Sequence, residues 1–255
     1  MPKKRFVELF AGSARMSENM SRLGVAASSY EITRHPLEDV TSNLNSGSLW
    51  RDIASGKVAA VWAGITCASW SMARRGPADY SGPPPPLRSS DDAGIWGLPN
   101  LRPRDQERVR LGNRLVRWLC RLTQHCIQLK VPILVENPQT SRLWLCPPMR
   151  SLLDKHGRSE VFHACQFGEA FKKPTKVAMW NCNMSDFART CKMSNGMCSN
   201  IGAPHWQLSG VDESGQWRSA QAATYSHGLC RCVAKELVTM LSAPQESHPP
   251  RPVHH

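Results

Sequence analysis

Short apolar runs alternate with amphipathic stretches along most of this chain. Four of the runs, at residues 6–10, 25–30, 57–62 and 131–135, predict strands that are buried on both faces of a parallel sheet. After the first run, Met16, Met20 and Leu23 recur at helical spacing and Gly24 offers a stop, so a helix is expected there. Residues 105–129 predict a long amphipathic helix. The predicted fold class is therefore α/β, a Rossmann-like sheet with helices on both faces.

The second half of the chain has a less regular pattern. It predicts a short helix at 142–153, a hairpin of strands at 161–167 and 177–180, and a last helix at 229–241. Hydrophobic periodicity fades between 181 and 210, and the Pro- and His-rich tail predicts disorder. We therefore expect a core (1–180), a small loop-rich region (181–225), a helix that closes the core (226–242) and a disordered tail (243–255).

The turn after the first strand has the composition of a cradle for a nucleotide-type ligand. Phe10, Ala11 and Gly12 separate the strand from a helix N-terminus, and Gly12 permits close approach of a ligand to the backbone. Glu31 ends the next strand about 20 residues later, where an acid accepts hydrogen bonds from ribose hydroxyls. An ordinary strand-to-helix turn with a surface glutamate is the alternative.

Reactive side chains follow the third and fourth strands, at the edge where open α/β sheets bind ligands. Cys67 comes just after the third strand, where a rigid sheet holds a thiol in place as a nucleophile. A buried filler cysteine is the alternative. Glu136 and Asn137 end the fourth strand and direct a carboxylate and an amide to the same site. Asp52 is expected on a loop beside the adenine of a nucleotide-type ligand, or else as a helix cap.

A Pro-rich insertion at residues 76–104 separates Cys67 from the long helix. Its composition does not favour a regular element, and Trp96 and Leu98 predict that part of it docks on the core. A segment that follows a candidate nucleophile can serve as a lid or a substrate clamp. An inert insertion is an equal alternative.

The net charge of +12 favours nucleic acid as the partner, although a basic surface also serves solubility. One face of the long helix carries four arginines, for which a solvated role is favoured over phosphate binding: Arg110, Arg114, Arg117 and Arg121. No apolar run reaches the length of about 18 residues that predicts a membrane span, and no signal peptide is visible. Ten cysteines without a secretory signal predict an intracellular protein with reduced thiols.

Four candidate metal ligands gather in the loop-rich region, namely Cys182, Cys191, Cys198 and His205. Thiolate and imidazole ligands suit zinc, and a stretch without a core gains most from a bound metal. The cysteines are separated by more than the usual spacing of about two to four residues, so a metal-free region is the alternative that the spacing favours.

Five motifs occur in an order that resembles the cytosine-C5 DNA methyltransferases, which use S-adenosylmethionine. They are Leu9-Phe-Ala-Gly12, Glu31, Asp52-Ile53, Gly64-Ile-Thr-Cys67 with Ser71, and Glu136-Asn-Pro138. The chain looks closest to the compact forms of phages, large viruses and mobile elements. Those forms carry an Arg-Arg and a Lys-Pro-Thr segment, here Arg74-Arg75 and Lys173-Pro-Thr175. The resemblance covers residues 6–180 and, more faintly, 181–241.

The resemblance implies a Rossmann-like S-adenosylmethionine-dependent methyltransferase sheet that transfers a methyl group to C5 of cytosine in DNA. It also implies that residues 181–225 form a small target-recognition region. The Cys67 thiolate would add to C6 of a cytosine flipped out of the duplex, while Glu136 contacts N3 and the exocyclic amine. The implied catalytic residues are Cys67, Glu136, Asn137 and Ser71. The implied cofactor-binding residues are Phe10, Ala11, Gly12, Glu31, Asp52 and Ile53, and the implied nucleic-acid-binding residues are Arg74, Arg75, Lys172 and Lys173.

Three departures from the family pattern keep other functions open. Thr66 stands where the family has the proline that fixes the loop before its cysteine, Pro138 stands where many members have valine, and the family's late arginine pair is not plainly present. The alternatives are an RNA cytosine-C5 methyltransferase and a catalytically inactive nucleic-acid-binding protein. An oxidoreductase is disfavoured because the first turn lacks the full glycine pattern. We expect a monomer, in the nucleus of a eukaryote or otherwise in the cytoplasm.

Overall fold

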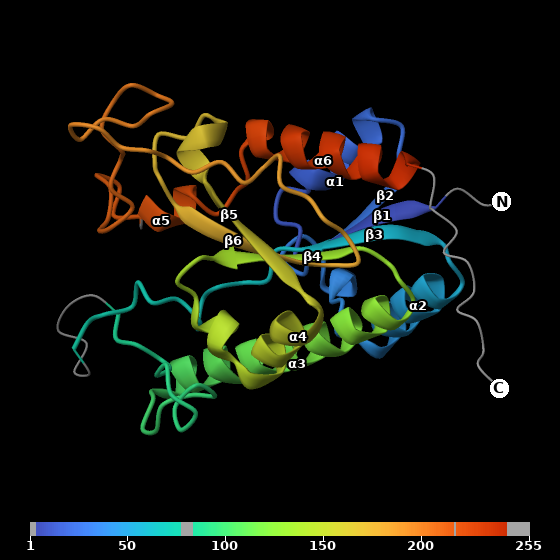
Figure 1. Ribbon diagram of the computed structural model, residues 1–255. Helices are drawn as coiled ribbons and strands as arrows, with labels where there is room; N and C mark the ends of the chain where they lie inside the picture. Colours follow the sequence, from blue (N-terminus) through green and yellow to red (C-terminus); the bar gives the residue numbers. More distant parts are fainter. Residues whose placement is uncertain (1–3, 78–83, 217, 244–255) are drawn as a thin grey trace, which may run out of the picture.

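A single twisted sheet of six strands forms the centre of the computed structural model, which describes residues 4–77, 84–216 and 218–243 (Figure 1). The strand order is β2-β1-β3-β4-β6-β5, with bounds β1 Arg5–Leu9, β2 Ala27–Tyr30, β3 Val58–Ala63, β4 Ile133–Pro138, β5 Arg158–His163 and β6 Pro174–Trp180. The first four strands pair in parallel, and β6 runs antiparallel to both β4 and β5. The predicted α/β class is confirmed.

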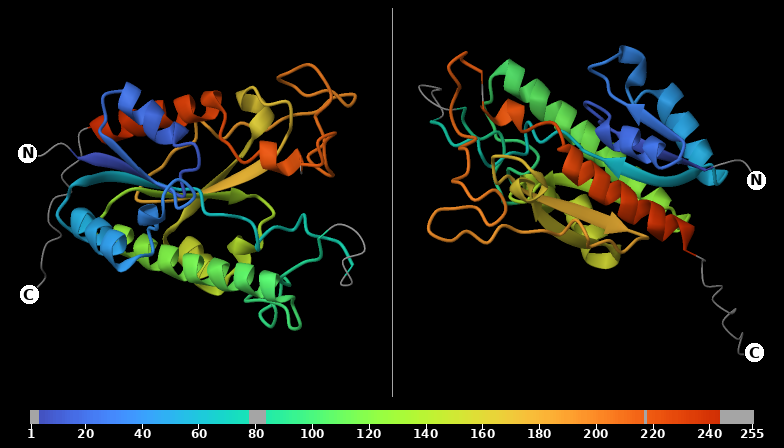
Figure 2. Two further views of the ribbon diagram at one scale, coloured as in Figure 1. Left: turned by 180° about the vertical axis from the view of Figure 1, so that it is seen from behind. Right: turned by 90° about the horizontal axis from the view of Figure 1, so that it is seen from above.

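Helices cover both faces of this sheet. α1 (Arg15–Arg22) and α6 (His227–Ser242) lie on one face, and α2 (Asn43–Ala54), α3 (Pro103–Gln128) and α4 (Pro147–His156) lie on the other (Figure 2). Three short 3₁₀ helices, η1 (Pro36–Glu38), η2 (Arg142–Leu145) and η3 (Ala164–Phe167), and the four-residue α5 (Arg218–Gln221) complete the regular structure of the described residues.

Two apolar cores explain the continuous apolar runs. Alternate residues of a strand point to opposite faces, so a central strand covered on both sides needs apolar residues at every position. In β3, Val61 packs in the core with α3, whereas Trp62 packs in the core with α6. In β4, Ile133 and Leu134 divide in the same way. The strands β3 and β4, whose carboxyl ends lie at the candidate site, are therefore packed on both faces.

The structure differs from the sequence prediction at two element boundaries. The helix predicted at 142–153 is split into η2 and α4, because Pro147 takes the first position of a new helix, where a missing N–H costs nothing. The strand predicted at 161–167 ends at His163, and η3 continues from there. The hairpin partnership is confirmed, but its second strand inserts between β4 and β5.

The described part of the Pro-rich insertion packs against α3, with Leu87 and Ile95 buried and Trp96 against the core. Residues 78–83, inside that insertion, and 244–255, which make up nearly all of the predicted disordered tail, lie outside the described residues. Among the helices of the described chain, none combines the length and the apolar character needed to cross a membrane.

Candidate functional site

A cavity of about 430 Å³ opens at the carboxyl ends of β1, β2 and β3. Its volume is within the range of small-molecule sites, about 300–1,000 Å³. The residues that line it are Phe10, Tyr30, Glu31, Ile32, Thr33, Glu38, Asp39, Val40, Gly64, Thr66, Leu111, Arg114 and Leu115. The cavity therefore lies at the carboxyl ends of the strands, where the sequence predicted a ligand site. Phe10 and Glu31, two of the predicted cofactor-binding residues, line it.

The turn after β1 is held in unusual backbone geometry. Phe10, Gly12 and Ala14 all have positive φ angles, of 57°, 51° and 56°, a region that non-glycine residues rarely occupy. The Gly12 N–H donates a hydrogen bond of 2.9 Å to Oε2 of Glu31. Burial alone raises the pKa of Glu31, but hydrogen bonds from Thr33 and Gly12 outweigh it and leave the pKa below the usual value. Glu31 is therefore an ionised acceptor at the cavity wall.

Asp52 and Ile53 do not reach this cavity. Asp52 lies in α2, not on the predicted loop, and forms a 2.6 Å ion pair with Arg5 at the start of β1. Ile53 is buried in the core. The cavity instead receives Asp39 and Val40, from the segment that follows η1. The sequence does carry a signal for these two residues. Asp39 is an acid followed by the β-branched Val40, and it lies eight positions after Glu31 (39 − 31).

Cys67 lies after β3 on an irregular segment, residues 64–71, which we call the cysteine loop. Asn137 Nδ2 donates a 2.6 Å hydrogen bond to the Ile65 carbonyl, and the Trp70 N–H donates one of 2.9 Å to the Cys67 carbonyl. Ser71 accepts from the Ala73 N–H at 3.1 Å. These bonds hold the cysteine loop in place, and Thr66 lies within it.

A fully buried arginine braces the same loop from the insertion. Arg88 donates to the Ser69 carbonyl and hydroxyl at 3.2 and 2.9 Å, and its guanidinium lies 3.5 Å from the centre of the Trp70 ring. Three further acceptors come from beyond the loop: the carbonyls of Ile95 and Val109 and the side chain of Asn113. Burial lowers the pKa of Arg88 to about 10, which still leaves it charged at neutral pH. No pattern in the sequence singled out this residue.

Glu136 lies buried on β4 beside a tyrosine that the sequence analysis also missed. Tyr225 donates a 2.9 Å hydrogen bond to Glu136 Oε2 and accepts one of 3.2 Å from the Trp62 indole N–H. The Tyr225 hydroxyl also lies so near Gly64 that a Cβ would not fit there. Tyr225 is therefore a bridge from the end of the loop-rich region to the carboxyl ends of β3 and β4.

Electrostatics couple Cys67, Glu136 and Lys173. Burial raises the pKa of the Cys67 thiol; the Lys173 ammonium opposes this rise and the Glu136 carboxylate adds to it. Burial also raises the pKa of Glu136, with Lys173 and the Tyr225 hydrogen bond opposing. A cavity of about 20 Å³, room for one water, is lined by Glu136, Lys173 and Tyr225 among others. Glu136, Lys173 and Tyr225 thus share one small polar site, and Cys67, which lines neither cavity, is coupled to Glu136 and Lys173 through their charges.

The other candidate nucleic-acid residues divide into two kinds. Arg74 is engaged by the protein, donating 2.8 Å to the Pro85 carbonyl and pairing with Asp105 at 3.5 Å. Arg75 is exposed, and Lys172 is half-buried. Lys173 donates to the Ala222 carbonyl and reaches the polar site. The structure therefore brings only Lys173 of these four residues to the wall of the small cavity.

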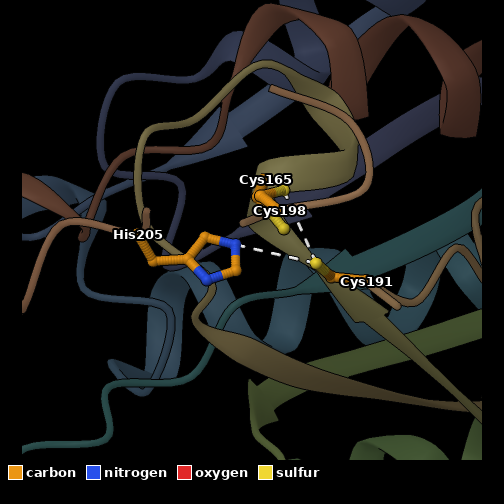
Figure 3. A group of neighbouring side chains, drawn as sticks. All are labelled: Cys165, Cys191, Cys198 and His205. Atoms are coloured by element: carbon orange, nitrogen blue, oxygen red, sulfur yellow. Dashed lines mark hydrogen bonds between the residues drawn. The ribbon is translucent and has the colours of Figure 1, made fainter. Parts of the chain in front are cut away.

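A second cluster of reactive side chains lies beyond β5. The ligand atoms of Cys165, Cys191, Cys198 and His205 all lie within 4.8 Å of one another and could hold a zinc ion (Figure 3). The prediction that included Cys182 is wrong, because that side chain packs against the core that contains α6. Cys165 replaces it. Cys165 precedes Cys191 by 26 positions (191 − 165) and sits at the end of an apolar run, so no spacing pattern indicated it.

Comparisons with known proteins add little at the level of sequence. No protein-family model and no curated protein matches the chain. Solved structures that resemble it include the S. pombe Dnmt2 methyltransferase, with 17% identity, a TM-score of 0.36, and coverage of 71% of this chain and 52% of that one. A triple mutant of DNMT2 from Spodoptera frugiperda gives 14% identity, a TM-score of 0.37, and coverage of 82% and 60%. The chain thus spans about half to three fifths of the length of these two proteins.

Proposed function

We propose that this protein transfers a methyl group from S-adenosylmethionine to C5 of cytosine in DNA. The observation that carries the proposal is the meeting, at one edge of the sheet, of a half-buried thiol, a buried carboxylate and a cavity of nucleoside size with an acidic wall. The net charge of +12 supports a polyanionic substrate.

The larger cavity fits S-adenosylmethionine in size and in the groups that line it. Glu31 offers an ionised carboxylate for ribose hydroxyls, and Asp39 a second acceptor for an adenine amino group. Phe10 and Val40 supply apolar surface for the adenine ring. When bound, this cofactor supplies a methyl group on a positively charged sulfur, which an electron-rich carbon can accept.

The chain's own residues must make cytosine C5 electron-rich, and two of them are suited to this. The Cys67 thiolate adds to C6, its lone pair forming a carbon–sulfur bond while the electrons of the C5–C6 double bond move toward C5 and N3. Glu136 at the ring's other edge stabilises the charge that develops at N3, and burial raises its pKa toward the range in which a carboxyl group can share a proton with a ring nitrogen. After methylation, loss of the C5 proton to a base reforms the double bond and expels the thiolate.

Tyr225 is a positioning residue in this scheme, since it touches Glu136 and not the reacting atoms. A cavity with room for one water does not admit a pyrimidine ring. Entry of the base therefore requires the segment that carries Tyr225 and Ala222 to move away from β4. This segment is the end of the loop-rich region, so nucleic acid that binds this region could displace it.

A covalent trap tests the reaction. Duplexes with 5-fluorocytosine in varied contexts are incubated with the protein and S-adenosylmethionine, and the mixture is run on a denaturing gel. Fluorine at C5 blocks the final elimination, so the protein stays bound through its cysteine. We expect an adduct that is lost in Cys67→Ala and retained in Cys182→Ala, a half-buried cysteine outside both clusters.

The same trap in single-stranded and structured RNA distinguishes the main alternative, because thiol addition serves either polymer. An adduct on RNA alone would replace DNA by RNA in the proposal. Absence of an adduct on both polymers, with S-adenosylmethionine still bound, would leave a nucleic-acid-binding protein without turnover.

Cofactor affinity provides an independent test of the cavity. Asp39→Asn removes an anionic acceptor from the cavity wall, so we expect binding of S-adenosylmethionine to weaken about tenfold by calorimetry. Asp52→Asn changes an acid bound to Arg5 outside the cavity and is expected to leave the affinity unchanged. The reverse pattern would return Asp52 to the adenine site and contradict this assignment.

A further inference from the structure

We propose that Cys165, Cys191, Cys198 and His205 bind one zinc ion, and that this ion fastens the loop-rich region to the sheet. The inference concerns a site outside the candidate active site and does not depend on methyl transfer. It rests on the geometry of the four ligand atoms, on their burial and on the donors that surround them.

Two of the distances between ligand atoms are close to those of a tetrahedron around a zinc ion. Zinc–sulfur bonds of about 2.3 Å and zinc–nitrogen bonds of about 2.0 Å place tetrahedral ligand atoms about 3.5–3.8 Å apart. Cys191 Sγ lies 3.5 Å from Cys198 Sγ and 3.7 Å from His205 Nε2 (Figure 3). All four ligand atoms fall within 4.8 Å of one another, so only small side-chain adjustments separate them from ideal coordination.

No disulfide explains the cluster. All ten cysteines are unpaired, and the 3.5 Å between the Cys191 and Cys198 sulfurs exceeds a covalent bond of about 2.05 Å. The three cysteines are at most 8% exposed and form a small cluster with little apolar company besides Ile201. Three sulfurs brought together in this way are best stabilised as thiolates around a cation.

Polar groups around the sulfurs match what a thiolate site requires. The Asn200 N–H points at Cys198 Sγ at 3.5 Å, the Ser199 hydroxyl at Cys191 Sγ at 3.7 Å, and the Gln166 amide at Cys165 Sγ at 3.7 Å. Each of the three thiol ligands thus has its own donor. Donors of this kind orient metal ligands and spread the negative charge of the sulfurs.

The ion would join parts of the chain that hydrogen bonds already connect, among them those from Asn200 Nδ2 to the Cys165 carbonyl at 2.7 Å and from the Cys191 N–H to His163 Nδ1 at 2.8 Å. Between the end of β6 and α5, the described chain has only turns and one isolated bridge, Ser194–Met197. Irregular segments of this length are uncommon unless something orders them. Three ligands come from this segment and the fourth, Cys165, comes from η3. Ala164, the neighbour of Cys165, lines the small cavity beside Glu136. Zinc therefore connects the loop-rich region to the wall of the candidate active site.

Metal analysis of the full chain tests the site. Protein purified with zinc available and without chelator is expected to contain about one zinc per chain. Cys165→Ser is expected to lower that content severalfold, and Cys182→Ser is expected to leave it unchanged. This pair distinguishes the ligand set found in space from the one that the sequence predicted.

X-ray absorption of the wild-type protein covers the case in which Cys165→Ser does not fold. We expect three sulfur ligands near 2.3 Å and one nitrogen near 2.0 Å around zinc. A metal content near zero, a shell without sulfur, or a Cys191–Cys198 disulfide in mass spectra would each overturn the proposal. Zinc lost in Cys182→Ser and kept in Cys165→Ser would overturn it as well.

Discussion

The cysteine loop and the loop-rich region are both irregular, but they are held in different ways. The cysteine loop follows a central strand and is fixed by hydrogen bonds from Asn137 and from the buried Arg88. The loop-rich region lies beyond the edge of the sheet, and four potential metal ligands lie where it meets η3. The thiol proposed to react is thus held in place by hydrogen bonds within the protein, whereas the neighbouring region is proposed to be held by a metal ion in addition to its own contacts. Removing Arg88 and removing the metal ion, one at a time, tests this contrast.

Loss of Arg88 is expected to have the largest effect. Arg88→Met leaves five buried or half-buried acceptors without their donor, so we expect the free energy of unfolding to fall by about 3–5 kcal/mol. Arg117→Met is the matched control, because Arg117 lies exposed over Trp96 and its loss should cost less than about 1 kcal/mol. Urea denaturation measures both. Equal losses in the two variants would contradict the role assigned to Arg88.

Removal of zinc is expected to have the next largest effect, confined to the second region. With a strong chelator present, amide hydrogen exchange at residues 186–206 should accelerate by about tenfold or more, since metal binding contributes folding free energy there. Exchange in β1, β3 and β4 should stay slow. Acceleration throughout the chain would mean that the metal holds the whole fold, and no acceleration would mean that the region is ordered without it.

Loss of the Tyr225 hydroxyl tests the link between the two regions. Tyr225→Phe keeps the ring against Trp62 but removes the hydrogen bond to Glu136, so adduct formation should slow by up to about tenfold. That bond lowers the pKa of Glu136, and without it the pKa rises. Glu136 then keeps its proton to higher pH, and the alkaline limb of the pH–rate profile should shift to higher pH. A purely structural role would leave the profile in place.

Loss of the Lys173 charge is expected to have the smallest effect, a shift in the pH dependence of Cys67 alkylation. Its ammonium lowers the pKa of Cys67, so in Lys173→Met the pKa rises and alkylation of Cys67 by iodoacetamide should need a higher pH. Lys172→Met is the matched control, since Lys172 does not contribute to the pKa of Cys67. Peptide mass spectrometry follows the alkylation. A shift to lower pH would contradict the proposed coupling.

The contrast also explains what the sequence could predict. Central strands are apolar at every position because both faces are covered, so the sheet and the placement of Cys67 and Glu136 near its edge followed from pattern alone. Arg88 and Tyr225 act through contacts across the fold: Tyr225 is 89 positions from Glu136 and lies in a stretch without periodicity. Cys165 was missed because it lies far from the other three residues of the cluster along the chain, so the sequence contains no ligand spacing that would indicate it. Asp52 was misplaced because a motif's order does not fix which segment reaches the cavity.

Transfer of labelled methyl groups tests the central claim most directly. DNA duplexes and RNA of mixed sequence are incubated separately with the protein and S-adenosylmethionine that carries an isotopically labelled methyl group, and the digested nucleosides are identified by mass spectrometry. The account predicts the label on C5 of deoxycytidine with the wild-type protein and with Cys182→Ala, and none with Cys67→Ala. Binding of both ligands without labelled cytosine in either polymer, or labelling that survives Cys67→Ala, would contradict it.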